Sequence, residues 1–281
     1  RAFHPGEQTS WQRNIAYPRL GFDSFKCGED MDVPQTEEHG YVSDDSDFEQ
    51  IIWEFEHKDE STPLFLFNVT IQNHGSYTVE DYPAEVQVAD EPGVYPKAEQ
   101  YLTLANKTDE AFKKLIDYFS AQTEPTILVM FGDHQPSVEQ EFLDKAYGVT
   151  QDEMTMAQYM DKFKVPFIIW ANYPLTGDST KITSLNFLAQ YVLRNAGIET
   201  SAYGKYLWNL QKTIPAMTFA GYFDSEGNAY SHLDTTKFTP LIEDYERVQY
   251  NNLFGGDERQ TAQFASPASA TSSDAANATS G

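Results

Sequence analysis

The sequence predicts an α/β fold with a mixed, largely parallel β-sheet and helices on both faces. Three unbroken apolar runs rich in β-branched and aromatic side chains carry this prediction: residues 64–71, 126–131 and 165–170. Uninterrupted apolar runs of this length are typical of strands buried on both faces. Segments with helical spacing of apolar residues lie between and after them, and this alternation favours an α/β arrangement.

The helices are expected at three places along the chain. Residues 98–121 carry apolar side chains at roughly helical spacing, and residues 184–195 repeat the pattern. Ser184 is a suitable N-cap for the latter helix, and Gly197 a suitable stop. An acidic stretch, residues 29–60, contains Lys58 as its only Lys or Arg. We interpret it as a solvated loop leading into a surface helix over residues 48–57, with a cation or partner site as the alternative.

The C-terminal region predicts a hairpin and then a tail. Residues 219–223 are followed by Asp224-Ser225-Glu226-Gly227, a typical turn sequence. We expect a domain over residues 1–256 and a flexible tail rich in Ala, Ser and Thr over residues 257–281.

Composition excludes several classes of protein. The 281 residues include 19 Lys and Arg against 43 Asp and Glu, a formal net charge of −24, and aromatic residues make up 14%. That aromatic content argues against a disordered chain. The negative charge argues against nucleic acid as a partner. A single cysteine, Cys27, rules out an internal disulfide framework.

Polar residues follow two of the predicted strands. His74 comes after the first run, and Asp133 and His134 come directly after the second, preceded by Gly132. Ligands in open α/β sheets bind beyond the carboxyl ends of strands. A carboxylate beside an imidazole suits Mn²⁺, Zn²⁺ or Mg²⁺. The alternative is a turn aspartate that caps its own backbone, next to an exposed histidine.

Several collinear motifs resemble one family. They are residues 65–77 (FLFNVTIQNHGSY), 131–136 (FGDHQP), 222–228 (YFDSEGN) and 244–255 (DYERVQYNNLFG), preceded by His4, Trp11-Gln12-Arg13 and residues 20–23 (LGFD). Together they are similar to the lipoteichoic acid synthase family, the phosphoglycerol transferases of the alkaline phosphatase/sulfatase superfamily. The resemblance covers nearly the whole chain except its tail.

The resemblance implies roles for six residues. Asp133 and His134 stand where the family places a metal-binding pair. Substrate-contacting residues of the family stand where His4, Trp11, Arg13 and His74 stand here, and His74 would also serve as a catalytic residue. The implied cofactor is a divalent cation, Mn²⁺ in the first place, with Mg²⁺ or Zn²⁺ as alternatives.

The same resemblance implies that the chain is the C-terminal part of an extracellular catalytic domain. The family's nucleophilic Thr and a further acidic metal ligand lie upstream of the His4 region, and no position of this sequence matches them. The sheet is therefore expected to be incomplete at its N-terminus. By itself the chain is expected to be soluble, to bind metal weakly and to be inactive.

The implied activity is transfer of glycerol phosphate from phosphatidylglycerol, or another anionic phospholipid, during synthesis of lipoteichoic acid or a related glycerol phosphate polymer of the cell wall. Expected partners are the upstream part of the same domain and membrane helices of the longer protein. The location would be the extracellular face of a bacterial cell membrane. Two alternatives remain open: a sulfatase or phosphodiesterase that hydrolyses another ester, and a catalytically inactive binding lobe.

Overall fold

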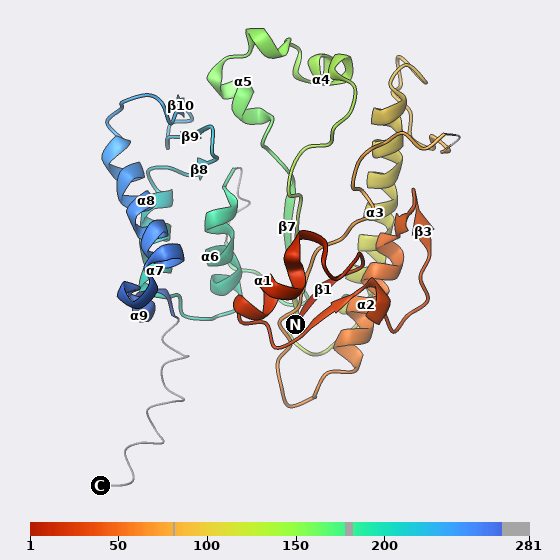
Figure 1. Ribbon diagram of the computed structural model, residues 1–281, viewed down its shortest axis with the longest axis horizontal. Helices are drawn as coiled ribbons and strands as arrows, with labels where there is room; N and C mark the ends of the chain where they lie inside the picture. Colours follow the sequence, from red (N-terminus) through yellow and green to blue (C-terminus); the bar gives the residue numbers. More distant parts are fainter. Residues whose placement is uncertain (81, 178–181, 266–281) are drawn as a thin grey trace. The chain divides into compact units, whose positions relative to one another are not determined.

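The computed structural model describes residues 1–80, 82–177 and 182–265 (Figure 1). Contacts between Cα atoms divide the chain into two compact units. The first comprises Arg1–Glu124 and Pro136–Gly148, and the second comprises Pro125–Gln135 and Val149–Gly281. The elements are α-helices and short strands, so the α/β class predicted from sequence is confirmed.

A parallel three-stranded sheet lies in the first unit. Its strands are β1 (Ala2–His4), β2 (Phe25–Cys27) and β5 (Phe67–Asn68), in the order β2-β1-β5. All pairs are parallel, and β1 is the central strand. The carboxyl ends of the three strands therefore meet at one edge of the sheet.

Helices cover both faces of this sheet. Successive residues of a strand point to opposite faces. On one face Phe25 and Phe67 pack against Tyr17 of α1 (Arg13–Arg19), with ring centroids 4.9 and 6.2 Å apart. On the other face the Asn68 amide donates to Asp47 of α2 (Asp44–Glu56) at 2.6 Å. The prediction of helices on both faces is confirmed for this sheet.

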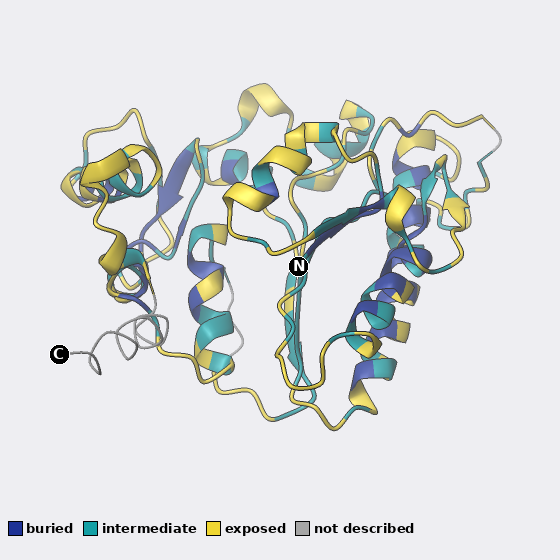
Figure 2. Ribbon diagram, turned by 60° about the horizontal axis from the view of Figure 1, so that its bottom comes forward, coloured by how far each residue is buried: buried dark blue, intermediate teal, exposed yellow. Residues whose placement is uncertain are grey.

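Helix α2 packs along α3 (Pro96–Ser120), the helix expected at residues 98–121. Phe48 meets Phe112 and Phe55 meets Phe119, with centroids 6.2 and 5.1 Å apart. Figure 2 shows α3 with buried and exposed sides, as an amphipathic helix requires. The first unit also contains η1 (Ser10–Gln12), η2 (Gly28–Asp30), the hairpin strands β3 (Glu37–Glu38) and β4 (Tyr41–Val42), and α4 (Gln140–Tyr147).

The acidic stretch is not a solvated surface throughout. Asp44, Asp47 and Glu54 are buried on the inner side of α2. Glu54 forms ion pairs with Arg1 and with Lys26 at 2.7 Å. The count of carboxylates in a sequence gives no sign of which ones a helix turns inward, so this part of the interpretation was wrong.

The other two apolar runs pair with each other in the second unit. Strands β6 (Ile127–Phe131) and β7 (Phe167–Ala171) form an antiparallel two-stranded sheet with Ile127 opposite Ala171. Both are half-buried, and Ile168 is 46% exposed. The expectation of three strands buried on both faces is therefore wrong in detail. Apolar content identified extended backbone, whereas pairing and cover depend on tertiary neighbours that periodicity does not reveal.

The remaining elements of the second unit surround an apolar core. Eight side chains form it: Phe187, Leu207, Leu210, Ile214, Tyr222, Phe238, Ile242 and Tyr245. Six of them come from α6 (Leu185–Asn195), α7 (Ala202–Gln211), α8 (Thr239–Phe254) and β9 (Gly221–Phe223), whereas Ile214 and Phe238 lie in the connecting segments. Strand β9 pairs with β8 (Ala216–Met217) and β10 (Ala229–Ser231) in a three-stranded sheet. Two short elements, η3 (Gln151–Glu153) and α5 (Met156–Asp161), precede β7.

Local signals in this unit worked well. Helix α6 starts after Ser184 as its N-cap, and Gly197 takes a φ of 69°, which glycine tolerates best. β9 and β10 form the expected hairpin, and Asp224 in its turn accepts hydrogen bonds from the backbone N–H of Glu226 and Asn228, each at 2.9 Å.

Two short helices continue past the expected boundary at residue 256. They are η4 (Gly256–Glu258) and α9 (Thr261–Phe264), and the Phe264 ring lies 5.0 Å from that of Tyr203. Residues 266–281, the rest of the expected tail, lie outside the described residues.

Candidate functional site

His4 ends the central strand and is held in one orientation. Its side chain is buried, and Nδ1 lies 2.7 Å from the carbonyl oxygen of Val69. Because a carbonyl only accepts, Nδ1 carries the proton and Nε2 keeps its lone pair. Burial lowers the pKa of His4, and the charge of nearby Arg13 lowers it further. The imidazole is therefore neutral at neutral pH, with Nε2 as an acceptor.

Gly6 gives the His4 ring its space. A Cβ at position 6 would lie 2.6 Å from Nε2 of His4, closer than any van der Waals contact allows. A side chain at residue 6 would thus displace the ring.

Trp11 and Gln12 lead into α1 with left-handed backbone, at φ of 57° and 52°. Non-glycine residues in this region cost about 1 kcal/mol or more each and cluster at functional sites. Trp11 is 82% exposed, so no core packing accounts for this geometry. Arg13 follows, half-buried, and its guanidinium donates to the carbonyl of Ser10 at 3.3 Å. No carboxylate pairs with it among the residues that the structure describes.

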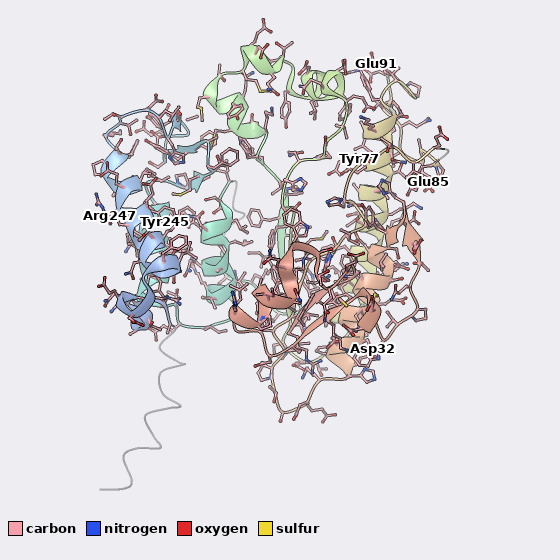
Figure 3. The ribbon with its side chains drawn as sticks, viewed as in Figure 1. Asp32, Tyr77, Glu85, Glu91, Tyr245 and Arg247 are labelled. Carbon is pink, nitrogen blue, oxygen red and sulfur yellow. The ribbon has the colours of Figure 1, made fainter. Side chains whose placement is uncertain are left out.

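His74 lies on the loop that follows β5, and its side chain is exposed. Its Nδ1 lies 2.8 Å from the carbonyl oxygen of Gly75, and its ring contacts that of Tyr41 at 5.8 Å. Tyr77, labelled in Figure 3, donates to the carbonyl of Asn73 at 2.8 Å and fixes the loop just before His74. His4 and His74 thus both follow strands of the same parallel sheet at its carboxyl edge.

A buried polar network anchors that loop. Thr108 of α3 donates to Asp44 at 2.6 Å and accepts from the Asn73 amide at 2.8 Å. Gln72 accepts from the backbone N–H of Asp44 at 2.9 Å and donates to the carbonyl of Leu104 at 3.2 Å. Burial raises the pKa of Asp44 to about 6. The network joins α2, α3 and the His74 loop into one rigid support.

A second buried carboxyl lies beside this network. Burial and the charge of Asp44 raise the pKa of Asp47 well above its usual range. Asp47 Oδ2 and Asn68 Oδ1 are buried without partners, while the other atoms of the two groups are hydrogen-bonded together. The hydrogen bond from the Asn68 amide partly opposes this rise in the pKa of Asp47.

Asp133 and His134 follow β6 in the second unit. Asp133 accepts from the backbone N–H of His134 at 2.8 Å, and His134 Nε2 lies 3.5 Å from Asp133 Oδ2. Their side chains are 83% and 73% exposed. Gly132 is required at this turn because a Cβ there would lie 3.0 Å from the Val165 side chain.

The chemistry of this pair fits a divalent cation, but only in part. A carboxylate and an imidazole are suitable ligands for Mn²⁺ or Zn²⁺, and such sites need about four or more donors. Within the described ranges no group of three or more His, Cys, Asp or Glu side chains could hold a metal ion. Asp133 and His134 can therefore supply two donors of a larger set.

The predicted site residues thus fall into two groups. His4, Trp11, Arg13 and His74 lie in the first unit, where His4 and Arg13 interact electrostatically. Asp133 and His134 lie together in the second unit. The resemblance and the two strand-end histidines lead us to expect that His4, Arg13, His74, Asp133 and His134 converge in one cleft, and this stays a prediction.

Family membership is decided by the sequence model named Sulfatase, which matches residues 1–198. The chain belongs to the sulfatase family. Two solved structures have a fold similar to that of this chain. The phosphoglycerol transferase GacH of Streptococcus pyogenes, solved with sn-glycerol-1-phosphate, matches with a TM-score of 0.71 at 18% identity, covering 94% of this chain and 64% of that one. An alkaline phosphatase superfamily protein of Vibrio parahaemolyticus matches with a TM-score of 0.55 at 14% identity, covering 94% of this chain and 66% of that one.

Two curated relatives in the family differ in their named roles. A Rhizobium meliloti (strain 1021) protein named for cyclic β-1,2-glucan modification is 27% identical over 91% of this chain and 40% of its own length. The lipoteichoic acid synthase-like protein YvgJ of Bacillus subtilis (strain 168) is 26% identical over 59% of this chain and 27% of its own length. The chain thus spans less than half the length of either relative. No helix in the part that the structure describes is long and apolar enough to cross a membrane.

Sequence reasoning missed the residues that support the site. Gly6, Asp44, Gln72 and Thr108 support His4 and the His74 loop. Of these, only Gln72 lies in a motif that the sequence analysis singled out, and that motif gave no sign of its supporting role. The position of Gly6, two residues after His4, offered the one usable signal. A glycine just after a buried strand often marks a place where another group lies too close to the backbone for a side chain.

Proposed function

We propose that the chain forms part of a metal-dependent phosphoglycerol transferase that takes glycerol phosphate from phosphatidylglycerol or another anionic phospholipid. The acceptor would be lipoteichoic acid or a related cell-surface polymer, at the extracellular face of a bacterial membrane. The names of GacH, a phosphoglycerol transferase, and of YvgJ, a lipoteichoic acid synthase-like protein, support this assignment. The observation that carries it is Arg13, a cation without a carboxylate partner among the described residues, beside the neutral His4 at the carboxyl edge of a parallel sheet.

The first-unit residues have distinct roles in this proposal. The Arg13 guanidinium donates two parallel hydrogen bonds to phosphate oxygens, a geometry that arginine favours. His4 accepts a hydrogen bond from a glycerol hydroxyl through Nε2. Trp11 provides an apolar wall for the glycerol carbons. His74, exposed and backed by the rigid network, donates a proton to the departing diacylglycerol oxygen.

Asp133 and His134 would hold Mn²⁺, with Mg²⁺ or Zn²⁺ as alternatives, together with donors from outside the described residues. When bound, the ion supplies positive charge that offsets the developing charge on the phosphoryl oxygens. The residues of this chain then keep the phosphate oriented. The nucleophile in this proposal is a Thr upstream of Arg1. Its oxygen bonds to phosphorus as the bond to diacylglycerol breaks, and an acceptor hydroxyl later displaces it.

The test compares this chain with a version extended upstream by the residues that precede Arg1 in the gene. Both are incubated with Mn²⁺ and a phosphatidylglycerol that carries a fluorescent diacylglycerol moiety, and released diacylglycerol is measured. We expect release from the extended protein and none from this chain. Loss of release in Arg13→Ala, with the exposed Arg19→Ala as matched control, would tie the activity to the site.

Two results would contradict the proposal. Release of inorganic sulfate from an aryl sulfate offered in a parallel assay, with no diacylglycerol released from phosphatidylglycerol, would assign a sulfatase. No turnover of any ester by a folded, metal-loaded extended protein would assign a binding lobe.

A further inference from the structure

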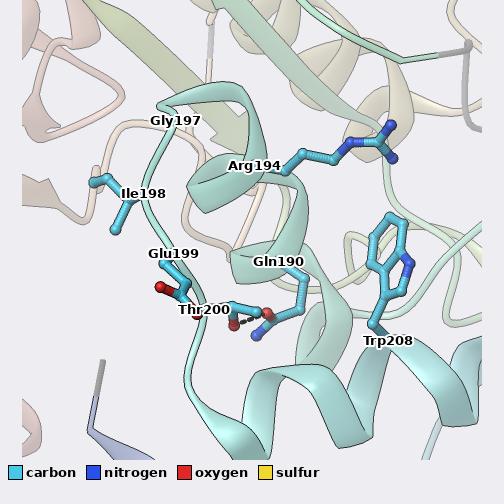
Figure 4. Close-up of a pocket in the computed structure, with 7 residues that line it drawn as sticks. All are labelled: Gln190, Arg194, Gly197, Ile198, Glu199, Thr200 and Trp208. Atoms are coloured by element: carbon cyan, nitrogen blue, oxygen red, sulfur yellow. Dashed lines mark hydrogen bonds between the residues drawn. The ribbon is translucent and has the colours of Figure 1, made fainter. Parts of the chain in front are cut away.

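A hollow of about 430 Å³ lies between α6 and α7 (Figure 4). None of the predicted site residues lines it. Its walls include Gln190 and Arg194 of α6, Thr200 of the connecting loop and Trp208 of α7. Figure 4 shows the Arg194 guanidinium and the Trp208 indole on the same side of the hollow, facing each other. Ligand pockets of this size hold small molecules or one to two sugar units.

A second hollow of about 270 Å³ also has Trp208 in its wall. Tyr191, Gln211 and Lys212 line it together with Trp208. The Tyr191 and Trp208 rings meet edge to face with centroids 5.4 Å apart. Trp208 therefore lines both hollows, which are called the groove and its two compartments below, and neighbouring compartments of this kind suit consecutive units of a polymer.

Each compartment contains a cation that no carboxylate neutralises in the described part of the chain. The Arg194 guanidinium lies 5.5 Å from the centre of the Trp208 ring. Lys212 donates to the Asn209 side chain at 2.9 Å. Glu199, the acid at the rim, forms an ion pair with Lys205 at 3.0 Å. In a chain with a net charge of −24, a groove with two such cations is set up for an anion.

The uncharged walls are ordered by hydrogen bonds. Thr200 donates to the buried Gln190 amide oxygen at 2.6 Å, as Figure 4 shows. Gln211 donates to the Tyr191 hydroxyl and to Thr183, each at 2.8 Å. Amides, hydroxyls and an aromatic face held in place are what recognition of a hydroxyl-rich ring requires, since they pair with its hydroxyls and cover its apolar face.

We propose that this groove binds a glycan bearing phosphate esters, with sugar rings against Trp208 and phosphate groups on Arg194 and Lys212. It would retain the polymer that accepts glycerol phosphate, or the product. The proposal rests on the proposed function for the choice of glycan, but binding is measured without turnover, so the two can fail separately.

The test uses this chain labelled with 5-fluorotryptophan, with the ¹⁹F signal of Trp208 assigned by Trp208→Phe. The probes are cyclic β-1,2-glucan without substituents and the same glucan carrying glycerol phosphate esters. We expect the substituted glucan to shift the Trp208 signal and to bind more tightly than the neutral one. Arg194→Ala should weaken it about fivefold, as loss of one exposed ionic contact does, and Lys212→Ala by a similar factor.

Arg247→Ala is the matched control, because this exposed arginine of α8 forms ion pairs outside the groove (Figure 3). It should leave binding unchanged. Equal affinity for the two glucans, binding insensitive to Arg194→Ala, or no Trp208 shift at millimolar glucan would each overturn the proposal.

Discussion

The two groups of predicted site residues are supported in opposite ways. His4 is buried at the end of a parallel strand, with one ring nitrogen held by a carbonyl and a glycine beside it that leaves room for the ring. Asp133 and His134 are more than two thirds exposed and contact mainly each other and their own backbone. Of the first group, His4 is preorganised by the fold around it. The second group is placed by a turn, and further ligands must fix its geometry.

The comparison indicates where mutation will be costly. Substitution of a group in a buried network changes the free energy of unfolding, whereas substitution of an exposed group changes function alone. Four predictions follow this contrast, from the largest effect to the smallest.

Asp44→Asn should change the pH dependence of stability most. The pKa of Asp44 is about 6 in the folded chain, above its ordinary value of 3.8. The folded state therefore holds the proton more tightly, and wild-type stability falls as pH rises from about 4 to 6. The variant should lose the share of this decline that Asp44 contributes, about 3 kcal/mol between pH 4 and pH 7, and keep the share that the buried Asp47 contributes. Urea unfolding at pH 4 and pH 7 measures this.

Asp45→Asn is the control, because Asp45 is part-exposed and pairs with Lys114 on the surface. It should leave the decline intact. A decline of the same size in Asp44→Asn would mean that Asp44 does not contribute to it. The raised pKa assigned to Asp44 within the buried network would then be wrong.

Thr108→Val should destabilise the first unit by about 2 kcal/mol, because it leaves Asp44 and Asn73 without their shared hydroxyl partner in a buried place. Thr108→Ser keeps the hydroxyl and should recover most of the loss. Equilibrium urea unfolding is the measurement. Equal stability of Thr108→Val and wild type would show that the hydrogen bonds of the Thr108 hydroxyl do not stabilise the first unit.

Arg13→Ala should weaken binding of sn-glycerol-1-phosphate about tenfold, as loss of a charged hydrogen bond predicts. Arg13→Lys should recover only part of it, since an ammonium cannot form the paired contact. Calorimetric titration measures both, with Arg19→Ala as control. Unchanged affinity in Arg13→Ala would place the phosphate elsewhere.

Asp133→Ala and His134→Ala should change the free energy of unfolding by less than about 0.5 kcal/mol, as expected of exposed side chains. Thermal unfolding without added metal is sufficient. A loss above about 1 kcal/mol would show a structural role for the pair and break the contrast with His4 and Thr108.

Sequence reasoning was strongest where the signal is local. Ser184 and Gly197 marked the ends of α6, and Asp224 and Gly227 marked the hairpin turn, because caps and turns depend on residues a few positions apart. The resemblance found the family and placed His4 and Arg13 in one neighbourhood. Burial was harder to predict. Asp44 and Asp47 are indistinguishable from the exposed Asp45 in sequence, and only the packing of α2 against its sheet and α3 separates them.

Strand pairing was equally hard to predict from the sequence. The run at residues 64–71 supplies a strand of two residues, whereas the less noticeable Ala2–His4 became the centre of the parallel sheet. Pairing joins residues that are far apart in sequence, and one chain without relatives aligned to it carries no signal for such contacts.

The central claim is that Asp133 and His134 hold a divalent cation, and Mn²⁺ itself can test it. The chain is labelled with ¹⁵N-histidine, and paramagnetic broadening of each ring is followed as Mn²⁺ is added, with His57 as the internal control. The account predicts that His134 broadens at lower Mn²⁺ than His57, and that Asp133→Ala abolishes this difference. Broadening of His134 no stronger than that of His57 would contradict it.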